Sequence, residues 1–417
     1  MLNSIQNFLE NYQLASPLQS DLFGRNITPK KHFLTTNSSQ TILNFENEFW
    51  TSKQRKSSSL HEISYRACFK AELPSFFIKM LTKENDVIYD PFAGRGTTPI
   101  EAALQKRHIV SNDINPLSQI FTEARLEIPT IENLSTRLKE IKISKKFSDQ
   151  TDLSMFFEKE TLNEILSLKN YLQKKRLSQS EDAIDKWIRM IATNRLTGHS
   201  TGFFSVYTLP PNQAISAKKQ LELNQKNNRQ PTYRDTKSII LKKTLSLIRS
   251  VSSEQKLNLK NAKNSAIFLN KSANSTPEIL DNSVNLIVTS PPFLDVIDYA
   301  ADNWLRCWFN EINFEEMQRN ISSHKKIEDW NKFISACFVE FQRITKPQGY
   351  VAFEVGEVKN GKIKLEEEVL PIGLNAGFKC VAIIINSQNF TKTSNIWGVE
   401  NNKKGTNSNR IVLFQKA

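Results

Sequence analysis

The feature that most constrains the fold is an alternation of short apolar strands with amphipathic helices, broken once by a long helical stretch. Strands are predicted at 87–92, 108–114, 266–270, 284–293 and 350–355, and helices at 99–107, 116–126 and 327–344. Such alternation predicts an α/β fold with a parallel, doubly wound sheet. Two further apolar runs, 378–385 and 410–416, have no helical pattern between them and predict an antiparallel hairpin at the C-terminal end of the sheet.

The break in this alternation is the stretch 127–265, where apolar residues recur at helical spacing. It lacks the alternating Val and Ile of strands, so we interpret it as a largely helical insertion into the sheet domain. The predicted division is an N-terminal extension (1–43), a first part of the sheet domain (44–126), the insertion (127–265) and a second part of the sheet domain (266–417).

Positive charge is concentrated in the insertion. The chain has 56 Lys and Arg against 43 Asp and Glu, and residues 195–265 hold 13 of the basic residues against 3 acidic ones. Such a basic region favours a polyanionic partner, most often nucleic acid, although a solvated helical surface has the same composition. We therefore predict that the insertion contacts DNA, with these candidate residues: Arg195, Lys218, Lys219, Lys242 and Lys243.

Cysteine and histidine usage argues against a metal site and against disulfides. The four cysteines form no CxxC pair, and the five histidines have no ligand spacing such as HxxxH. No apolar run approaches the roughly 20 residues of a membrane span, and the first 20 residues lack the basic start of a signal peptide. We expect a soluble protein of a reducing cytoplasm, associated with the nucleoid, without metal or membrane.

The first candidate site is a glycine turn that follows a strand and opens a helix. Glycines in such a turn let the backbone approach a ligand, and the helix N-terminus attracts negative charge. Asp113 stands 17 residues beyond Gly96, at the end of the next predicted strand, where its carboxylate can accept hydrogen bonds from both hydroxyls of a ribose. The predicted binding residues of the turn are Asp90, Phe92, Ala93, Gly94, Gly96 and Thr97.

The second candidate site is the sequence Thr289-Ser290-Pro291-Pro292-Phe293 at the end of another strand. Two successive prolines hold the backbone extended and donate no N–H, which leaves the carbonyls and the Ser290 hydroxyl as acceptors. Phe293 offers a flat ring beside them. This combination suits a planar group with an amino function, such as a base turned out of the duplex.

Together the two sites resemble the exocyclic-amino DNA methyltransferases, which act on cytosine N4 or adenine N6. The order of the sites, with a large segment between them, is that of the alpha group of this family, whose sheet is Rossmann-like. The resemblance implies S-adenosyl-L-methionine as cofactor, bound by the glycine turn and Asp113. It adds Lys70 near the methionine end and Ser272 or Asn270 near the adenine, where the family commonly has an acidic residue.

The resemblance also implies the reaction. Ser290, Pro291, Pro292 and Phe293 would be catalytic: the Ser290 hydroxyl and Pro291 carbonyl accept hydrogens of the amine, and Phe293 stacks on the base. The SPP form is typical of the N4-cytosine enzymes. Double-stranded DNA is then the substrate, and a companion restriction endonuclease is a possible partner.

Other functions stay open. Transfer to adenine N6, to an RNA base or to a protein glutamine would use similar residues, and the basic insertion disfavours the last of these. A non-catalytic DNA-binding protein on the same scaffold is a further alternative. Methylation of cytosine C5 is disfavoured, since no cysteine follows a proline here as that chemistry requires.

Overall fold

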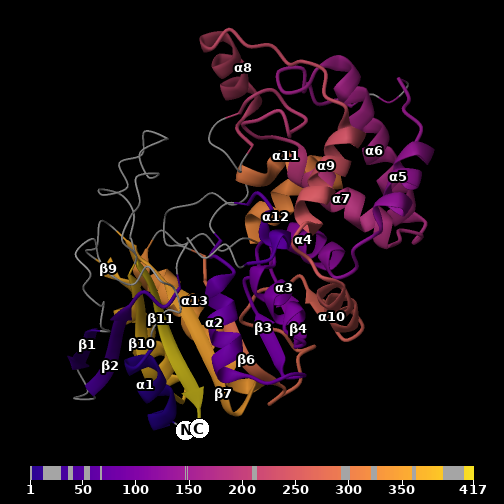
Figure 1. Ribbon diagram of the computed structural model, residues 1–417. Coiled ribbons are helices and arrows are strands. Elements are labelled where there is room, and N and C mark those ends of the chain that lie inside the picture. Colours follow the sequence, from indigo (N-terminus) through magenta and orange to yellow (C-terminus); the bar gives the residue numbers. More distant parts are fainter. Residues whose placement is uncertain are drawn as a thin grey trace, which may run out of the picture.

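The fold is built on a large twisted sheet with helices on both faces (Figure 1). The computed structural model describes residues 2–12, 30–35, 41–50, 57–65, 68–145, 147, 149–208, 214–292, 301–320, 326–358, 363–387 and 408–417. In these residues nine strands form the sheet, in the order β1-β2-β10-β11-β7-β6-β3-β4-β5. The strands are β1 (Lys30–Thr35), β2 (Thr41–Asn47), β3 (Val87–Asp90), β4 (His108–Asn112), β5 (Ile267–Leu269), β6 (Val284–Thr289), β7 (Thr345–Val355), β10 (Phe378–Ser387) and β11 (Ser408–Lys416). A separate short pair is formed by β8 (Glu357–Val358) and β9 (Ile363–Lys364).

The pairing confirms the predicted fold class. Strands β5, β4, β3, β6 and β7 are mutually parallel, whereas β11 pairs antiparallel with both β7 and β10. The hairpin therefore closes one side of a doubly wound sheet. One boundary differs from the prediction: β7 begins at Thr345, immediately after its helix, and its register with β6 shifts between the Thr345 and Tyr350 pairs.

Helices cover both faces because neighbouring strand residues point to opposite sides. In β6, Leu286 and Val288 pack into the core that contains α2, α3 and α4, whereas Ile287 packs against α13 and α14. The covering helices are α2 (Glu72–Leu81), α3 (Thr97–Leu104), α4 (Leu117–Arg125), α13 (Ile327–Ile344) and α14 (Leu365–Asn375). Two short helices, α11 (Trp304–Asn310) and α12 (Phe314–Asn320), precede α13. One 3-10 turn (Ala301–Asn303) comes directly before α11, and another (Ser59–His61) comes before α2.

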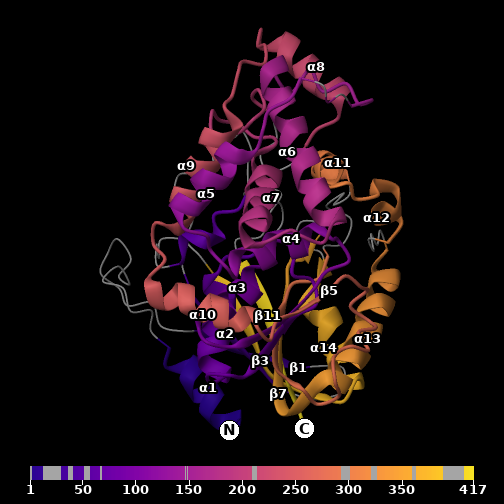
Figure 2. The same ribbon diagram turned by 90° about the vertical axis from the view of Figure 1, so that its right-hand side faces the viewer.

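The predicted insertion is helical in the part of it that the structure describes. It contains α5 (Ile131–Glu140), α6 (Lys159–Leu177), α7 (Ala183–Arg195), α8 (Ala217–Lys226), α9 (Thr236–Ile248) and α10 (Ser253–Lys263). Helices α5 to α9 lie together beyond one end of the sheet, whereas α10 lies beside the sheet (Figures 1 and 2). The insertion shares one continuous apolar core with the sheet domain, since Trp187 and Ile188 belong to the same buried cluster as Leu117 and Phe121.

The N-terminal region takes part in the sheet. Strand β2, which crosses the predicted boundary at residue 43, pairs in parallel with β10. The amide groups of Phe49 and Trp50 both donate to the Asn386 side chain, at 2.8 and 3.1 Å. From α1 (Leu2–Glu10), the Gln6 amide donates to the Val381 carbonyl at 3.0 Å. This region therefore continues the sheet beyond the hairpin.

Candidate active site

The glycine turn and Asp113 lie next to each other at the carboxyl ends of β3 and β4. The Gly94 N–H donates to Asp113 Oδ2 at 2.7 Å, and the Asn115 N–H donates to Oδ1 at 2.8 Å. Burial raises the pKa of Asp113 to about 6, although both hydrogen bonds favour its charged form. Each carboxylate oxygen keeps a second lone pair as an acceptor. The structure thus joins two groups that the sequence placed 19 residues apart.

The two glycines of the turn have different roles. Both have positive φ, 54° at Gly94 and 79° at Gly96. A Cβ at Gly96 would overlap the Thr122 hydroxyl of α4, so this glycine serves helix packing. A Cβ at Gly94 would meet only the Tyr65 ring, at 3.7 Å, and the carbonyl of Phe92, at 3.9 Å. Among the described residues, Gly94 is thus free of the overlap found at Gly96, and its role in ligand binding stays a prediction.

Asp90 is buried beneath the turn and connects the two candidate sites. Its Oδ1 accepts from the Phe92 N–H at 3.1 Å and from the Thr289 hydroxyl at 2.6 Å. Its Oδ2 is buried without a hydrogen-bond partner among the residues described. Burial raises the pKa of Asp90 to about 7. Because Thr289 directly precedes Ser290, this bond positions the Ser290 turn, which is predicted to be catalytic, beside the glycine turn.

The other predicted residues of the turn have mostly structural contacts. The Ala93 N–H donates to the Asn112 carbonyl at 2.9 Å, which ties the turn to the end of β4. The Thr97 hydroxyl accepts from Arg95 Nε at 3.1 Å, and the Phe92 ring lies 6.1 Å from the Phe333 ring. Lys70 lies just before α2, with an exposed side chain.

The loop after β5 is fastened to the end of β4. Asn112 Nδ2 donates to the Lys271 carbonyl at 3.0 Å, and Asn270 Nδ2 donates to the Asp113 carbonyl at 2.6 Å. Ser272 is half-buried in this loop. Asn270 therefore contacts the Asp113 backbone, and a role of Asn270 or Ser272 near a cofactor stays a prediction.

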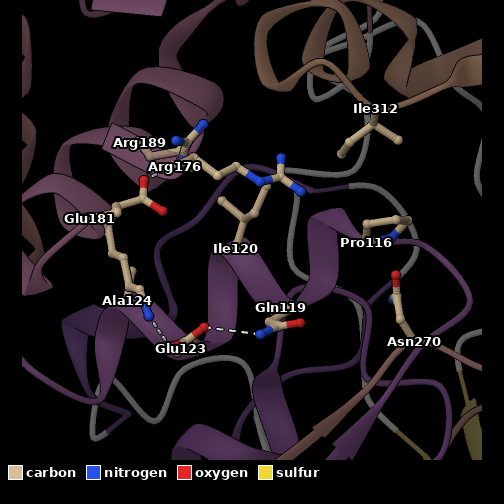
Figure 3. A pocket seen from close by; sticks show the side chains of 11 residues that line it. Pro116, Gln119, Ile120, Glu123, Ala124, Arg176, Glu181, Arg189, Asn270 and Ile312 are labelled. Atoms are coloured by element: carbon tan, nitrogen blue, oxygen red, sulfur yellow. Dashed lines mark hydrogen bonds and ion pairs between the residues drawn. The ribbon is translucent and has the colours of Figure 1, made fainter. Parts of the chain in front are cut away.

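Asn270 also lines a polar cavity of about 290 Å³ between the sheet domain and the insertion (Figure 3). Pro116 and Ile120 of the sheet domain form one wall, and Arg176 and Arg189 of the insertion form the opposite one. Because Pro116 and Asn270 follow the carboxyl ends of β4 and β5, the insertion lies over this edge of the sheet. The cavity was not predicted, since no local pattern in the sequence brings these four segments together.

At the second site, Ser290 meets a carboxylate that the sequence analysis missed. Ser290 and Asn409 both favour the charged form of Glu354, and Asn409 Nδ2 donates to Glu354 Oε1 at 2.7 Å. Burial raises the pKa of Glu354, whose side chain is only 6% exposed. A signal was present: in the strand sequence YVAFEV, the lone acidic residue falls near the carboxyl end, where parallel strands carry functional groups.

The two prolines of this site are not equivalent. The Pro292 carbonyl accepts from Trp330 Nε1 at 3.1 Å, so it serves to anchor the turn to α13. Pro291 is buried directly after Ser290. Phe293, predicted to stack on the base, lies outside the described residues.

The predicted DNA-binding residues have unlike surroundings. Lys218 and Lys219 on α8 and Lys242 on α9 are exposed, whereas Lys243 is half-buried. Arg195 is buried at the end of α7, with its guanidinium 4.0 Å from the Phe203 ring centre. In the described part of the chain, no cluster of His, Cys, Asp and Glu has the geometry of a metal site, and no helix is long and apolar enough to span a membrane.

Comparison with known proteins supports the predicted resemblance to DNA methyltransferases. Residues 20–121 match the family described as DNA methylase, which unites the N6 and N4 enzymes. The predicted family resemblance is confirmed. The chain is 24% identical over 341 residues, 72% of its length, to the Type II methyltransferase M.BsoBI of Geobacillus stearothermophilus. It spans 65% of that relative.

Two further similarities cover different shares of this methylase-like chain. A stretch of 53 residues, 13% of the chain, is 40% identical to 16% of the Type II methyltransferase M.PvuII of Proteus hauseri. A SAM-dependent methyltransferase structure from Methanosarcina mazei aligns with 82% of the chain and 96% of its own length, at 11% identity and a TM-score of 0.32. A TM-score of 0.32 is too low to support an assignment of the fold, which therefore depends on the strand order described above.

Proposed function

We propose that this protein transfers a methyl group from S-adenosyl-L-methionine to the exocyclic N4 amine of cytosine in double-stranded DNA. The observation that carries the proposal is the place of the Ser290 turn: the Thr289 hydroxyl donates to Asp90 beneath the glycine turn, and Glu354, near the carboxyl end of β7, is the carboxylate whose charged form Ser290 favours. The match of residues 20–121 to the DNA methylase family supports the reaction class. The SPP form of the catalytic turn favours cytosine.

The glycine turn and Asp113 together form a cradle whose groups fit the cofactor. Gly94 leaves space above its backbone, and Asp113 retains acceptor positions for the ribose hydroxyls. Asn270 or Ser272 would lie near the adenine, next to the cavity of Figure 3, and Lys70 near the methionine end. When bound, the cofactor supplies an electrophilic methyl group on a sulfonium.

The chain's own residues then position the amine. We infer that the Ser290 hydroxyl donates to the Glu354 carboxylate, whose charged form it favours, and that the Ser290 oxygen accepts a hydrogen of the amine. The Pro291 carbonyl accepts the other, because the Pro292 carbonyl is already bonded to Trp330. This arrangement localises the nitrogen lone pair, and Glu354 can receive the displaced proton through Ser290. Catalysis of this kind depends on positioning and charge stabilisation, without a covalent intermediate.

The test is mass spectrometry of nucleosides from DNA treated with the protein and cofactor. We expect N4-methylcytosine with the parent, and a loss of at least about tenfold in turnover with Ser290→Ala and with Glu354→Gln. Cofactor affinity should stay at the parental value in both variants. If N6-methyladenine is the sole product, the proposed target base is wrong and adenine is the substrate. If the protein binds DNA but no methylated base is found, the non-catalytic alternative is favoured.

A role in a restriction-modification system is a further part of the proposal. It is supported by the relatives M.BsoBI and M.PvuII, both named Type II methyltransferases. Such a role predicts that DNA carrying this protein's methylation resists one restriction endonuclease that cuts unmethylated DNA. Digestion of methylated and control DNA with a panel of endonucleases checks this, and cleavage by every enzyme of the panel would count against it.

A further inference from the structure

Four polar residues lie in a row across neighbouring strands, at the edge of the sheet that carries the Ser290 turn. Strands β10, β11, β7 and β6 are adjacent in that order (Figure 1). Asn386 of β10 pairs with Asn409 of β11 in the antiparallel register. Glu354 is next to the last residue of β7, and Ser290 directly follows β6. We call Asn386, Asn409, Glu354 and Ser290 the polar row.

The strand members of the polar row project from one face of the sheet. Glu354 pairs with Ile411, and Asn409 lies two residues before Ile411 on the same strand, so both side chains are on the same face. Ile384, two residues before Asn386, pairs with Ile411 and belongs to the same buried cluster. Polar side chains therefore replace apolar ones on this face where the strands reach the candidate active site.

Asn409 gives Glu354 a direct hydrogen bond, from Nδ2 to Oε1 at 2.7 Å. Burial raises the pKa of Glu354, whereas Ser290 and Asn409 both lower it. In the described part of the chain, no charged side chain contributes to the pKa of Glu354, and the neighbouring Arg410 pairs instead with Glu366. Because a buried charge without hydrogen bonds is costly, the charged form of Glu354 depends on its two polar neighbours.

Asn386 fixes which way the Asn409 amide faces. Asn386 Oδ1 accepts from the N–H groups of Phe49 and Trp50 at 2.8 and 3.1 Å, so its own amide cannot turn over without the loss of both bonds. Its Nδ2 is buried and has no hydrogen-bond partner among the described residues. Asn409 thus has a donor on its β10 side and a carboxylate on its β7 side. Only with its oxygen toward Asn386 and its NH2 toward Glu354 do both sides match.

We propose that Asn409 is a positioning residue of the reaction: its amide, oriented by Asn386, holds the Glu354 carboxylate charged and beside Ser290. This inference rests on the proposed function, in which Glu354 receives the proton that the amine loses. As the nitrogen gains the methyl group, one amine proton passes to the Ser290 oxygen, and the Ser290 hydroxyl proton passes to Glu354, which becomes neutral. Asn409 acts through Glu354 and contacts neither base nor cofactor in this scheme.

The test is the pH dependence of turnover in Asn409→Ala. Methyl transfer to unmethylated genomic DNA is measured by nucleoside mass spectrometry at saturating cofactor over a pH series. Loss of the amide raises the pKa of Glu354 further, and only its charged form can receive the proton. Turnover should therefore fall at least about tenfold relative to the parent at the acid end of the series, and this loss should shrink as the pH rises.

Asn331→Ala is the matched control. Asn331 Nδ2 also donates to a carboxylate, Glu368 Oε2 at 2.6 Å, but it does so between α13 and α14, which cover the other face of the sheet. This variant loses the same kind of hydrogen bond without a contact to the polar row. Its turnover should follow the parental pH profile.

A double-variant cycle separates positioning from a role in the fold. In a Glu354→Gln background the side chain at position 354 cannot carry charge, so Asn409→Ala should cause no further loss of turnover at any pH. A residue that serves only the fold would lower turnover by the same factor in both backgrounds. Asn409→Ser, whose side chain also lacks the amide, replaces Asn409→Ala throughout if the alanine variant does not fold.

The outcomes are distinct. A parental pH profile in Asn409→Ala, with a parent that methylates DNA, would overturn the positioning role and leave the proposed function intact. A loss that is uniform over the pH series, or that recurs in full beside Glu354→Gln, would assign Asn409 to the fold and overturn the proposal. An equal pH-dependent loss in Asn331→Ala would also overturn it, because the effect would not belong to the polar row. A parent that yields no methylated base would overturn the proposed function itself, and this inference with it.

Discussion

At the scale of single residues, two carboxyl groups at neighbouring strand ends are held largely out of water. Asp90 lies beneath the glycine turn and Asp113 beside it at the end of β4, and burial raises the pKa of both, to about 7 and about 6. An acid with a raised pKa stabilises the fold at low pH, where it is protonated, and this contribution is lost as the pH rises through the folded-state pKa. The site therefore costs stability near neutral pH.

Asp90→Asn measures that cost. The residue at position 90 of the variant cannot ionise. The unfolding free energy of the parent should therefore fall by about 2–3 kcal/mol relative to that of the variant as the pH rises from about 5 to about 8. Urea denaturation of both proteins at the two pH values gives the four free energies. A difference that does not change with pH would mean that Asp90 ionises in the folded protein as it does in water.

Asp113→Ala tests the cofactor cradle. Hydrogen bonds to a charged acceptor are worth about 1.5–3 kcal/mol each, so loss of the ribose hydrogen bonds should weaken S-adenosyl-L-methionine binding at least tenfold in calorimetry. Asp152→Ala is the matched control, because Asp152 also accepts a backbone N–H, from Ser154 at 2.9 Å, but is exposed in the insertion. Unchanged affinity in Asp113→Ala would remove this residue from the binding site.

At the scale of elements, the two glycines that precede α3 are expected to have separate roles, Gly96 in the packing of α3 against α4 and Gly94 in cofactor binding. Gly96→Ala places a methyl group against Thr122 in a left-handed conformation, which we expect to lower the unfolding free energy by at least about 2 kcal/mol. Gly94→Ala meets no such overlap, so it should cost only about 1 kcal/mol, for its positive φ. Cofactor affinity should fall in Gly94→Ala. Equal losses of stability in the two variants would contradict this division.

Helix α8 provides a second prediction at this scale. Lys218 and Lys219 are both exposed on it, and the insertion carries most of the chain's excess positive charge. Reversal of both charges, Lys218→Glu with Lys219→Glu, should weaken binding to specific and random duplexes alike and flatten the salt slope by about 0.9 for each phosphate that is no longer neutralised. If slope and affinity stay parental, α8 is a solvated surface.

Most strands and helices of the parallel sheet and the hairpin followed local patterns and were predicted, because apolar alternation and glycine or proline breaks lie within each segment, whereas β1, β2, α2 and α14 were not predicted. The glycine turn, Asp113 and the Ser290 turn were predictable for the same reason. Glu354 was missed because its partner, Ser290, lies on another strand, 64 residues away. The cavity was missed because it arises where the insertion meets the sheet domain, a long-range contact without any local signal.

At the scale of the whole molecule, the insertion and the sheet domain are one packing unit. Trp187, Ile188 and Ile191 of α7 share a buried cluster with Leu117 and Phe121 of α4. Lys186 forms an ion pair with Glu123 across the same contact. An insertion that folded by itself would need an apolar core of its own. Here the insertion and the sheet domain share one core, and the boundary between them passes through it.

We therefore expect a single cooperative unfolding transition. Tryptophan fluorescence, which includes Trp187 of the insertion and Trp330 of the sheet domain, should change at the same temperature as the far-ultraviolet circular dichroism. The fragment 127–265 should lack a cooperative transition when it is expressed alone. Two separated transitions in the intact chain would show instead that the insertion is an independent domain.

The place of β11 has a consequence for the order of events during synthesis. This strand follows all the other strands in the chain, yet it lies inside the sheet, between β7 and β10. Until it leaves the ribosome, β7 and β10 each present an unpaired edge, and the β1–β2 pair on β10 has no link to the parallel strands. Both edges are open together only between the synthesis of β10 and that of β11, because β7 ends at Val355 and β10 at Ser387. The sheet can close only when β11 has been made and pairs with both β7 and β10.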